Sequence, residues 1–289
     1  MRLSRHALVF GGSGAIGAAL IARLQASGWQ VDALSRAPRP AQSGLRWLPG
    51  EFAALPALPA RCDAVFSCGP LDLFSHWYAA ASIACPRVVA FGSTSDATKR
   101  DATDPGEREL AARLRASADR VLAAARARGA AATLLRPTLV YGSGRDRNLS
   151  RIVQLARRTG FFVLPGDAVG RRQPVHVEDL AGAALAAVDA DAAMDRDFAL
   201  AGGETLTYRA MVARTLAVLA PPPRLVVVPS PVFAGAYALA RASGRLRGLP
   251  PGAVARMRED LVFDVAPARE AFGYAPRAFV PDAGMFAAG

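Results

Sequence analysis

Apolar and polar positions along the first half of the chain alternate between two patterns. Short apolar runs, typical of strands buried on both faces, are separated by segments whose apolar residues recur about every fourth position. Ile16, Leu20 and Leu24 show this helical spacing, and Gly28 ends it. The patterns predict a long helix over 106–128 and strands at residues 6–10, 29–35, 45–48, 63–68, 87–93 and 132–142.

Strands that alternate with helices imply parallel strands joined by right-handed crossovers. We therefore expect an α/β fold with a doubly wound parallel sheet of the Rossmann type and a smaller, discontinuous C-terminal lobe. The expected dinucleotide-binding domain spans 1–142 and is completed by about 171–190. The expected substrate-binding lobe is formed by 143–170 and 191–289.

The second half has a less regular pattern. A helix is predicted to begin with Asp179 as its N-cap, and Pro221–Pro223 precede a strand-like "RLVVVP". The helical stretch 232–247 is apolar and has arginines only late. Packing against the core is its first interpretation, and an interfacial membrane helix is the second.

Composition indicates a globular protein, because 52% of the residues are hydrophobic and 20% are charged. The net charge is +11, but the arginines are scattered among acids, so no nucleic-acid partner is expected. The chain has neither a signal-like start nor an apolar run of membrane-spanning length, so we expect a cytoplasmic protein without a membrane partner, monomeric or homodimeric. Cys62, Cys68 and Cys85 have no metal-ligand spacing, which predicts buried reduced thiols and no metal site.

Glycines follow the first predicted strand and open the first predicted helix. Gly12, Gly14 and Gly17 fit G-x-G-x-x-G, and Gly11 extends the pattern. Glycine allows a tight turn, and missing side chains let a pyrophosphate approach backbone N–H groups and the positive helix end. The expected dinucleotide contacts are Gly11, Gly12, Ser13, Gly14, Ala15, Ile16 and Gly17.

The end of the second strand indicates which dinucleotide is bound. NAD sites usually place Asp or Glu there for the ribose 2′-hydroxyl, but this strand ends in Ser35 and Arg36, with Arg39 nearby. Asp32 lies three residues too early. Because a guanidinium pairs well with a 2′-phosphate, NADP(H) is favoured over NAD(H). The alternative for Arg36 is an ordinary solvated strand end.

The chain resembles the extended short-chain dehydrogenases/reductases of the NAD(P)-dependent nucleotide-sugar epimerase/dehydratase superfamily. The motifs that carry the resemblance, in order, are "VFGGSGAIG", "VVAFGSTS", "LLRPTLVYGSGRD", "RRQPVHVEDLA", "GGETLTYRAM" and "AREAFGYAPRAF". The resemblance implies that Thr94, beside Ser93 and Ser95, binds the substrate oxygen. It also implies that Ser93 and Pro137 contact the cofactor. A hydroxyl-rich turn that satisfies its own backbone is the alternative.

The family's Tyr-x-x-x-Lys pair is missing. Ala111 stands at the tyrosine position and Arg115 at the lysine position, and Lys99 is the chain's one lysine. Arginine supplies charge and donors but is no neutral base. We therefore treat Ser95, Lys99 and Arg115 as catalytic candidates with Thr94, the alternative for Lys99 being a solvated loop residue.

A second group of residues concerns the substrate. The resemblance places Arg172 at a substrate diphosphate, and Arg145 lies in the loop after "VYGSG", with Arg171 and Arg147 as neighbours. The expected substrate is a small molecule, phosphorylated or nucleotide-linked. His176 is interpreted as a core histidine; the remaining tyrosines considered as proton donors, both interpreted as structural, are Tyr78 and Tyr141.

These features support an NADP(H)-dependent oxidoreductase or epimerase that acts on a nucleotide-linked sugar or a related carbonyl compound. Ala111 and Arg115 favour a different class, a catalytically silent NADP(H)-binding sensor or scaffold. A third hypothesis is a quinone or small-aldehyde reductase, which turnover without a nucleotide group would support.

Overall fold

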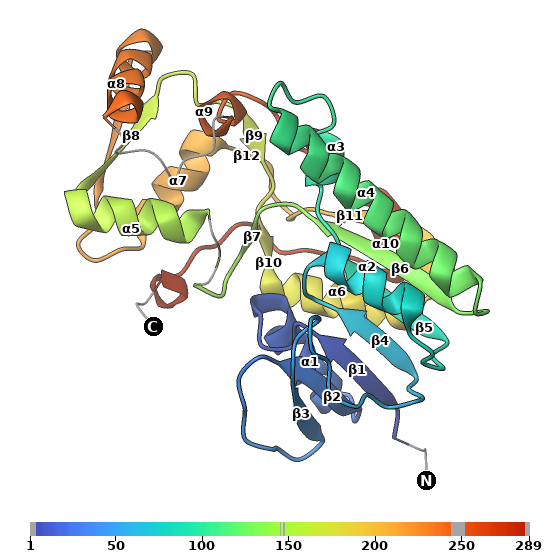
Figure 1. Ribbon diagram of the computed structural model, residues 1–289. Helices are drawn as coiled ribbons and strands as arrows, with labels where there is room; N and C mark the ends of the chain where they lie inside the picture. Colours follow the sequence, from blue (N-terminus) through green and yellow to red (C-terminus); the bar gives the residue numbers. More distant parts are fainter. Residues whose placement is uncertain (1–3, 145, 147, 244–251, 287–289) are drawn as a thin grey trace. The chain divides into compact units, whose positions relative to one another are not determined.

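The computed structural model describes residues 4–144, 146, 148–243 and 252–286 (Figure 1). Its backbone separates into two compact units. Unit 1 comprises residues 1–138, 177–200 and 264–275, and unit 2 comprises 139–176, 201–263 and 276–289.

Unit 1 is built on a seven-stranded sheet in the order β11-β6-β5-β4-β1-β2-β3, in which every pairing is parallel. The strands are β1 (His6–Phe10), β2 (Gln30–Ser35), β3 (Leu45–Pro49), β4 (Ala64–Ser67), β5 (Arg87–Phe91), β6 (Ala131–Pro137) and β11 (Arg196–Leu200). The central strands are buried almost throughout, which explains their continuous apolar runs. The expected α/β fold with a parallel Rossmann-type sheet is confirmed.

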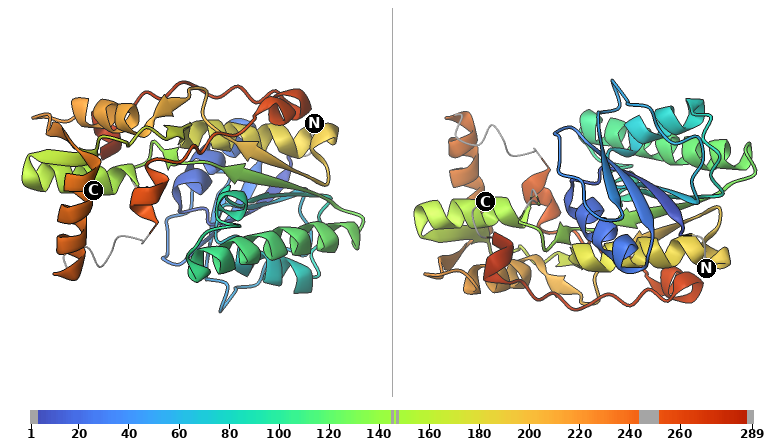
Figure 2. Two further views of the ribbon diagram at one scale, coloured as in Figure 1. Left: turned by 90° about the horizontal axis from the view of Figure 1, so that it is seen from above. Right: turned by 90° about the horizontal axis from the view of Figure 1, so that it is seen from below.

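Helices cover both faces of this sheet. Helix α2 packs on α4, and α1 packs on α6, on opposite sides of the strands (Figures 1 and 2). The helices of unit 1 are α1 (Ala15–Ala26), α2 (Leu71–Ala80), α3 (Ser95–Thr98), α4 (Pro105–Arg126), α6 (Val177–Asp189), the short η1 (Asp191–Ala193) and α10 (Ala266–Phe272). The arrangement is the doubly wound one that the alternating pattern predicts.

Unit 2 has a smaller core and short strands. Helices α5 and α7 bury Leu149, Val153, Met211 and Val212 in one apolar cluster. The strands pair two by two: β10 with β7, β12 with β9, and β13 with β8. The elements are β7 (Val140–Tyr141), α5 (Leu149–Thr159), β8 (Phe161–Pro165), β9 (Arg171–Arg172), β10 (Val175–His176), β12 (Leu206–Thr207), α7 (Tyr208–Ala217), β13 (Arg224–Val228), α8 (Ser230–Ala242), α9 (Ala253–Arg256) and η2 (Ala283–Phe286).

Three sequence expectations differ from the structure. The strand expected over 132–142 ends at Pro137, and Val140–Tyr141 form a separate strand. Asp179 is not the N-cap of α6, because that helix begins at Val177 and places Asp179 in its first turn. The domain bounds also differ: residues 191–200 and 264–275, expected in the substrate lobe, belong to unit 1, and 139–142 and 171–176, expected in the dinucleotide-binding domain, belong to unit 2. Residues 196–200 form β11 of the main sheet, where they pair with β6. Their hydrogen bonds join segments about sixty residues apart, which local patterns do not encode.

Candidate coenzyme and active site

The turn between β1 and α1 requires glycine for steric reasons. Gly11 has a φ of +72°, in the left-handed region, and its carbonyl accepts a hydrogen bond from the Gly14 N–H at 3.0 Å. A Cβ at Gly17 would lie 2.2 Å from the Gly11 oxygen, and one at Gly11 would lie 2.7 Å from the Gly69 nitrogen. The backbone of the turn is therefore packed so closely that side chains are excluded.

The same turn leaves the start of α1 open to an anion. Gly14 is the N-cap of this twelve-residue helix, no side chain caps it, and its first turn has no acid. The first turn of α1 therefore brings no acidic side chain to the positive end of the helix dipole. The Gly11–Gly17 segment fits the diphosphate of a dinucleotide by this chemistry.

The end of β2 lies beside the glycine turn. A Cβ at Gly12 would approach the Trp47 ring to 3.3 Å, and the Arg39 guanidinium lies 5.1 Å from the centre of that ring. Arg39 also donates to the Ser35 hydroxyl at 3.3 Å. Arg36 is exposed and has no ion-pair partner among the described residues. The geometry keeps the Arg36 charge available to an anion.

Asp32 has a structural role. Its side chain is buried, and Arg46 holds it with two hydrogen bonds of 2.7 and 2.5 Å. His6 Nε2 lies 3.1 Å from the same carboxylate. This acid is fully engaged between β1, β2 and β3, so it does not serve as the acidic residue of an NAD site.

At the carboxyl end of β5, Thr94 is bound to the end of β6. Both its N–H and its hydroxyl donate to the Pro137 carbonyl, at 3.3 and 3.2 Å. The Ser93 hydroxyl accepts from the Ser95 N–H at 3.2 Å. The turn thus satisfies part of its own backbone, as the alternative interpretation expects, while it holds a buried hydroxyl at the carboxyl edge of the sheet.

The structure adds a charged cluster that the sequence reasoning missed. Asp96 is buried and pairs with Arg136 at 2.8 Å, and Arg136 also pairs with Asp197 at 3.1 Å. The backbone carbonyl of Asp96 accepts from Arg115 at 2.9 Å. The acid inside "STSDATK" was the available signal, but its partner on β6 is forty positions further along.

The predicted catalytic candidates on α3 and α4 are positioned by other residues. Lys99 lies 3.3 Å from Glu107, and both side chains are largely buried. Ala111 is completely buried, and Arg115 holds the loop at Asp96. Arg115 therefore has a positioning contact, and the catalytic roles of Thr94, Lys99 and Arg115 remain predictions.

In unit 2 the Arg172 guanidinium is buried and makes three hydrogen bonds to backbone carbonyls of the same unit. It donates to the carbonyls of Arg171 at 2.8 Å and Glu259 at 2.7 Å, and also to that of Arg256. It lies 5.4 Å from the Tyr208 ring centre, and burial lowers the pKa of Arg172. A diphosphate role for Arg172 stays a prediction that would require exchange of these bonds.

Three other arginines were considered as neighbours of the substrate. Arg171 is paired with Asp260, at 2.7 Å. Arg145 and Arg147 lie outside the described residues.

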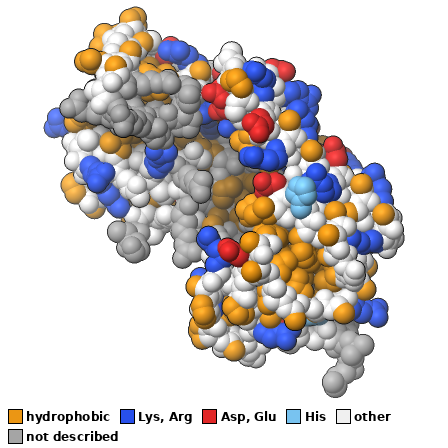
Figure 3. Space-filling view, viewed as in Figure 1, with side chains coloured by type: hydrophobic (Ala, Val, Ile, Leu, Met, Phe, Trp, Pro, Cys, Tyr) orange, Lys and Arg blue, Asp and Glu red, His pale blue; other side chains and the backbone are white. Residues whose placement is uncertain are grey.

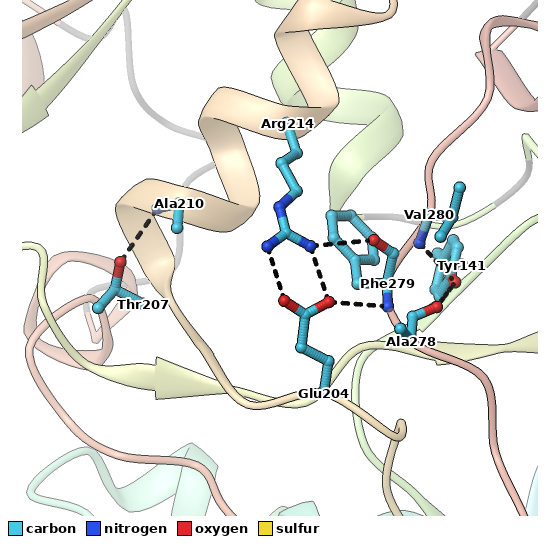
Figure 4. Close-up of polar contacts among 8 residues, drawn as sticks. All are labelled: Tyr141, Glu204, Thr207, Ala210, Arg214, Ala278, Phe279 and Val280. Atoms are coloured by element: carbon cyan, nitrogen blue, oxygen red, sulfur yellow. Dashed lines mark hydrogen bonds and ion pairs between the residues drawn. The ribbon is translucent and has the colours of Figure 1, made fainter.

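Two other candidates of unit 2 are buried together. His176 packs edge to face on Tyr141, with ring centres 5.0 Å apart, and a Cβ at Gly142 would lie 2.4 Å from His176 Nε2. The Tyr141 hydroxyl donates to the Ala278 carbonyl and accepts from the Val280 N–H, each at 3.3 Å (Figure 4). Tyr141 therefore anchors the C-terminal segment, in agreement with its structural interpretation.

Tyr78 and Cys62 lie inside the core of unit 1, whereas the backbone of Cys68 lies against the glycine turn, where a Cβ at Gly11 would meet it at 2.8 Å. Tyr78 stacks on Phe74 and is buried in the core of unit 1, and burial raises its pKa. Burial likewise raises the pKa of the Cys68 thiol, to about 12, while Cys62 is buried and Cys85 half-buried. All three cysteines are free thiols.

A hollow of about 720 Å³ lies at the amino ends of the strands, at the end of the sheet opposite to the glycine turn. It is lined by Arg5, Asp63, Arg87 and Ala131, at the amino ends of β1, β4, β5 and β6. Ligands of open parallel sheets bind at the carboxyl ends of the strands, so this hollow is not the coenzyme site. Among the described residues, no helix has the length and apolarity needed to cross a membrane, and no three potential metal ligands come together.

Part of the chain matches a known protein family. Residues 69–201, just under half of the chain, match the NAD dependent epimerase/dehydratase family. The resemblance to NAD(P)-dependent epimerases and dehydratases that the motifs indicate is therefore confirmed.

A curated relative and several solved structures extend the match. The chain is 28% identical to a 2-alkyl-3-oxoalkanoate reductase of Stenotrophomonas maltophilia, over 95% of this chain and 96% of the relative. The fold resembles the terminal R domain of the myxalamid biosynthetic pathway, with a TM-score of 0.73, 16% identity and coverage of 99% and 89%. It also resembles MoeE5 in complex with UDP-glucose and NAD, with a TM-score of 0.68, 19% identity and coverage of 98% and 96%.

Proposed function

We propose that the protein is an NAD(P)(H)-dependent oxidoreductase that reduces a carbonyl compound and prefers NADP(H). The observation that carries the proposal is the side-chain-free turn from Gly11 to Gly17 at an uncapped helix start. Thr94 stands at the same edge of the sheet, because β5 and β1 are parallel and separated only by β4. Neighbouring strands are about 4.8 Å apart, so the two strand ends are within the length of a dinucleotide.

Bound at this edge, NADPH supplies the hydride that a carbonyl carbon accepts. The chain's own residues then act on the carbonyl oxygen. Thr94 orients that oxygen through its hydroxyl, which requires the bond to Pro137 to be exchanged or shared. Lys99, held by Glu107, is the proposed source of the proton that completes the alcohol, directly or through water. Arg115 fixes the loop that carries both groups.

For the substrate we favour a 3-oxo compound over a nucleotide-linked sugar. The name of the Stenotrophomonas relative supports a 3-oxoalkanoate-like carbonyl, and that relative aligns over nearly the whole chain. The engagement of Arg172 with three backbone carbonyls argues against its use on a diphosphate. The UDP-glucose bound to MoeE5 supports the nucleotide-sugar alternative.

The test combines coenzyme binding with turnover. NADPH titrated into the purified protein should change its fluorescence on binding, and NADPH oxidation should depend on a 2-alkyl-3-oxoalkanoate. Thr94→Ala should lower kcat about 100-fold with little change in NADPH affinity, as expected for loss of one donor to a developing oxyanion. Thr94→Ser, which keeps the hydroxyl, is the matched control. Absence of NADPH and NADH binding would refute the proposal.

A silent coenzyme-binding module is the second candidate, favoured by the buried Ala111 at the tyrosine position. It predicts full NADPH affinity with no oxidation across 3-oxo acids, keto-sugar nucleotides, quinones and small aldehydes. Turnover of keto-sugar nucleotides alone would instead support the original nucleotide-sugar hypothesis.

A further inference from the structure

Two of the three cysteines stand opposite each other just before β4 and β5 begin. The parallel register of these strands continues upstream of both, because Arg61 is bridged to Ala84 with the same offset as the pairs inside the sheet. This register sets Cys62 opposite Cys85. Neighbouring strands lie about 4.8 Å apart, within the Cα separation of roughly 4.4–6.8 Å that a disulfide needs.

The two sulfur atoms are in contact. The thiols of Cys62 and Cys85 share a hydrogen bond, and the Cys85 thiol also donates to the Arg87 carbonyl at 2.9 Å. The bond with Cys62 lowers the pKa of Cys85, whereas the same bond and burial raise the pKa of Cys62. Cys85 is therefore the thiol of the pair that ionises more readily, and Cys62 stays protonated beside it.

The pair lies at the border of the apolar core of unit 1. Cys62 is 4% exposed and belongs to this core, and the half-buried Cys85 packs against it. Hydrophobic side chains, orange in Figure 3, also gather on the face of unit 1 that carries α2. Ala84 and Pro86, on either side of Cys85, are exposed. A partly exposed sulfur in apolar surroundings suits a small neutral oxidant, because a large charged one would lose hydration there.

We propose that Cys62 and Cys85 form a dithiol site that hydrogen peroxide oxidises to an intramolecular disulfide. First, the Cys85 sulfur attacks a peroxide oxygen: the S–O bond forms, the O–O bond breaks, and the departing hydroxide takes the thiol proton to give water. The Cys62 sulfur then attacks the sulfenic sulfur of Cys85: the S–S bond forms, the S–O bond breaks, and hydroxide leaves with the Cys62 proton as a second water. Two thiols are oxidised to one disulfide, and one peroxide is reduced to two waters.

Cys68 is an internal control, because it lies at the other end of β4. The whole strand, Ala64–Ser67, separates it from Cys62, and four strand residues span about 13 Å. Disulfide partners have Cα atoms within about 7 Å of each other. Cys68 should therefore remain a thiol while the other two cysteines are oxidised.

Mild oxidation of the reduced full-length chain with hydrogen peroxide tests the proposal. The thiols that an alkylating reagent labels in denaturant should fall from three to one, and dithiothreitol should restore all three. Trypsin leaves the three cysteines on one peptide, so chymotrypsin, which cuts after Phe66 and Tyr78, is added to separate them. Mass spectrometry should then find the Cys62 peptide linked to the Cys85 peptide, with Cys68 alkylated.

Serine variants separate the roles of the sulfurs. Cys85→Ser should slow thiol loss about tenfold or more, because the sulfur that ionises is gone. Cys62→Ser should leave Cys85 as a sulfenic acid that dimedone traps, since no second sulfur attacks it. Cys68→Ser is the matched control and should form the disulfide at the native rate. The native chain should also melt roughly 5 °C higher when oxidised, because the bond closes the loop from Cys62 to Cys85.

Three outcomes would overturn the proposal: three free thiols after oxidation, a disulfide that includes Cys68, or a link between two chains. The peptide map of the native chain decides among them without any variant, so a variant that fails to fold does not affect the result. The two sulfurs lie at the amino ends of the strands, opposite to the glycine turn. NADPH affinity should therefore be the same before and after oxidation, and the proposed function stands or falls separately.

Discussion

The Gly11–Gly17 turn and the α3–α4 segment both follow the carboxyl ends of parallel strands in unit 1, but they are built differently. The turn presents backbone N–H groups, and it is closed to substitution because added Cβ atoms would meet backbone atoms. The α3–α4 segment presents side chains, among them Ala111 and Arg115, which the resemblance places at the positions of a tyrosine and a lysine. A substitution in the turn therefore has to move backbone atoms, whereas a substitution in the α3–α4 segment changes side-chain contacts.

The largest expected effect comes from breaking the turn. Gly17→Ala places a Cβ 2.2 Å from the Gly11 oxygen, so the turn must move. We expect about a 100-fold loss of NADPH affinity and roughly 3 kcal/mol of destabilisation, measured by fluorescence titration and thermal unfolding. Gly235→Ala, on α8 where a Cβ meets nothing within 4 Å, is the control and should be neutral or slightly stabilising. Native affinity in Gly17→Ala would disprove the steric argument.

A tyrosine introduced at position 111 tests whether the fold has room for the side chain that the resemblance implies there. Ala111 is completely buried, so Ala111→Tyr overpacks the base of α4 and should cost roughly 3 kcal/mol of unfolding free energy. The neighbouring Ala112→Tyr, at an exposed position of the same helix, should unfold at close to the native temperature. A stable and more active Ala111→Tyr would show that the site had kept room for the tyrosine.

The preference for NADPH over NADH tests the proposed role of the Arg36 side chain at the end of β2. Arg36→Ala should weaken NADPH about tenfold and leave NADH nearly unchanged, because one charge-assisted pair with the 2′-phosphate is lost. Arg158→Ala, an exposed arginine on α5, controls for the general loss of charge. Equal losses for the two coenzymes would remove Arg36 from the site.

The smallest effect concerns a side-chain contact in unit 2. Arg214 donates to both carboxylate oxygens of Glu204, at 2.6 and 2.7 Å, and lowers the pKa of Glu204 (Figure 4). A lowered folded-state pKa stabilises the fold above the unfolded value of about 4.3, and this contribution disappears as the pH falls through the folded value.

Glu204→Gln should therefore lower the melting temperature slightly at pH 7 and converge with the native chain in acid. Because the pair is partly exposed, the effect should stay within about 1 kcal/mol. Asp101→Asn, at an exposed carboxylate without an ion pair among the described residues, should show no such convergence. A constant difference at all pH values would contradict the assignment.

Features made of neighbouring residues were predicted from the sequence better than contacts between distant segments. The glycine turn and the alternation of strands with helices in the first half of the chain were predictable, because both depend on neighbouring residues and on apolar runs. The pairing of Asp96 with Arg136 and the use of Arg172 on backbone carbonyls were not, because each joins segments distant in the chain. The exposure of α8, on which Val232 and Leu239 are 60% and 74% exposed, was not predicted either, since the apolar pattern of residues 232–247 first indicates packing against the core.

By itself, the sequence determined the parallel α/β architecture and the glycine turn between β1 and α1. Hydrophobic periodicity and backbone sterics act over a few residues, so they can be recognised without coordinates. The tertiary structure decided which polar groups are already engaged and which apolar side chains stay exposed. Those properties depend on neighbours that only folding brings within hydrogen-bonding or van der Waals distance.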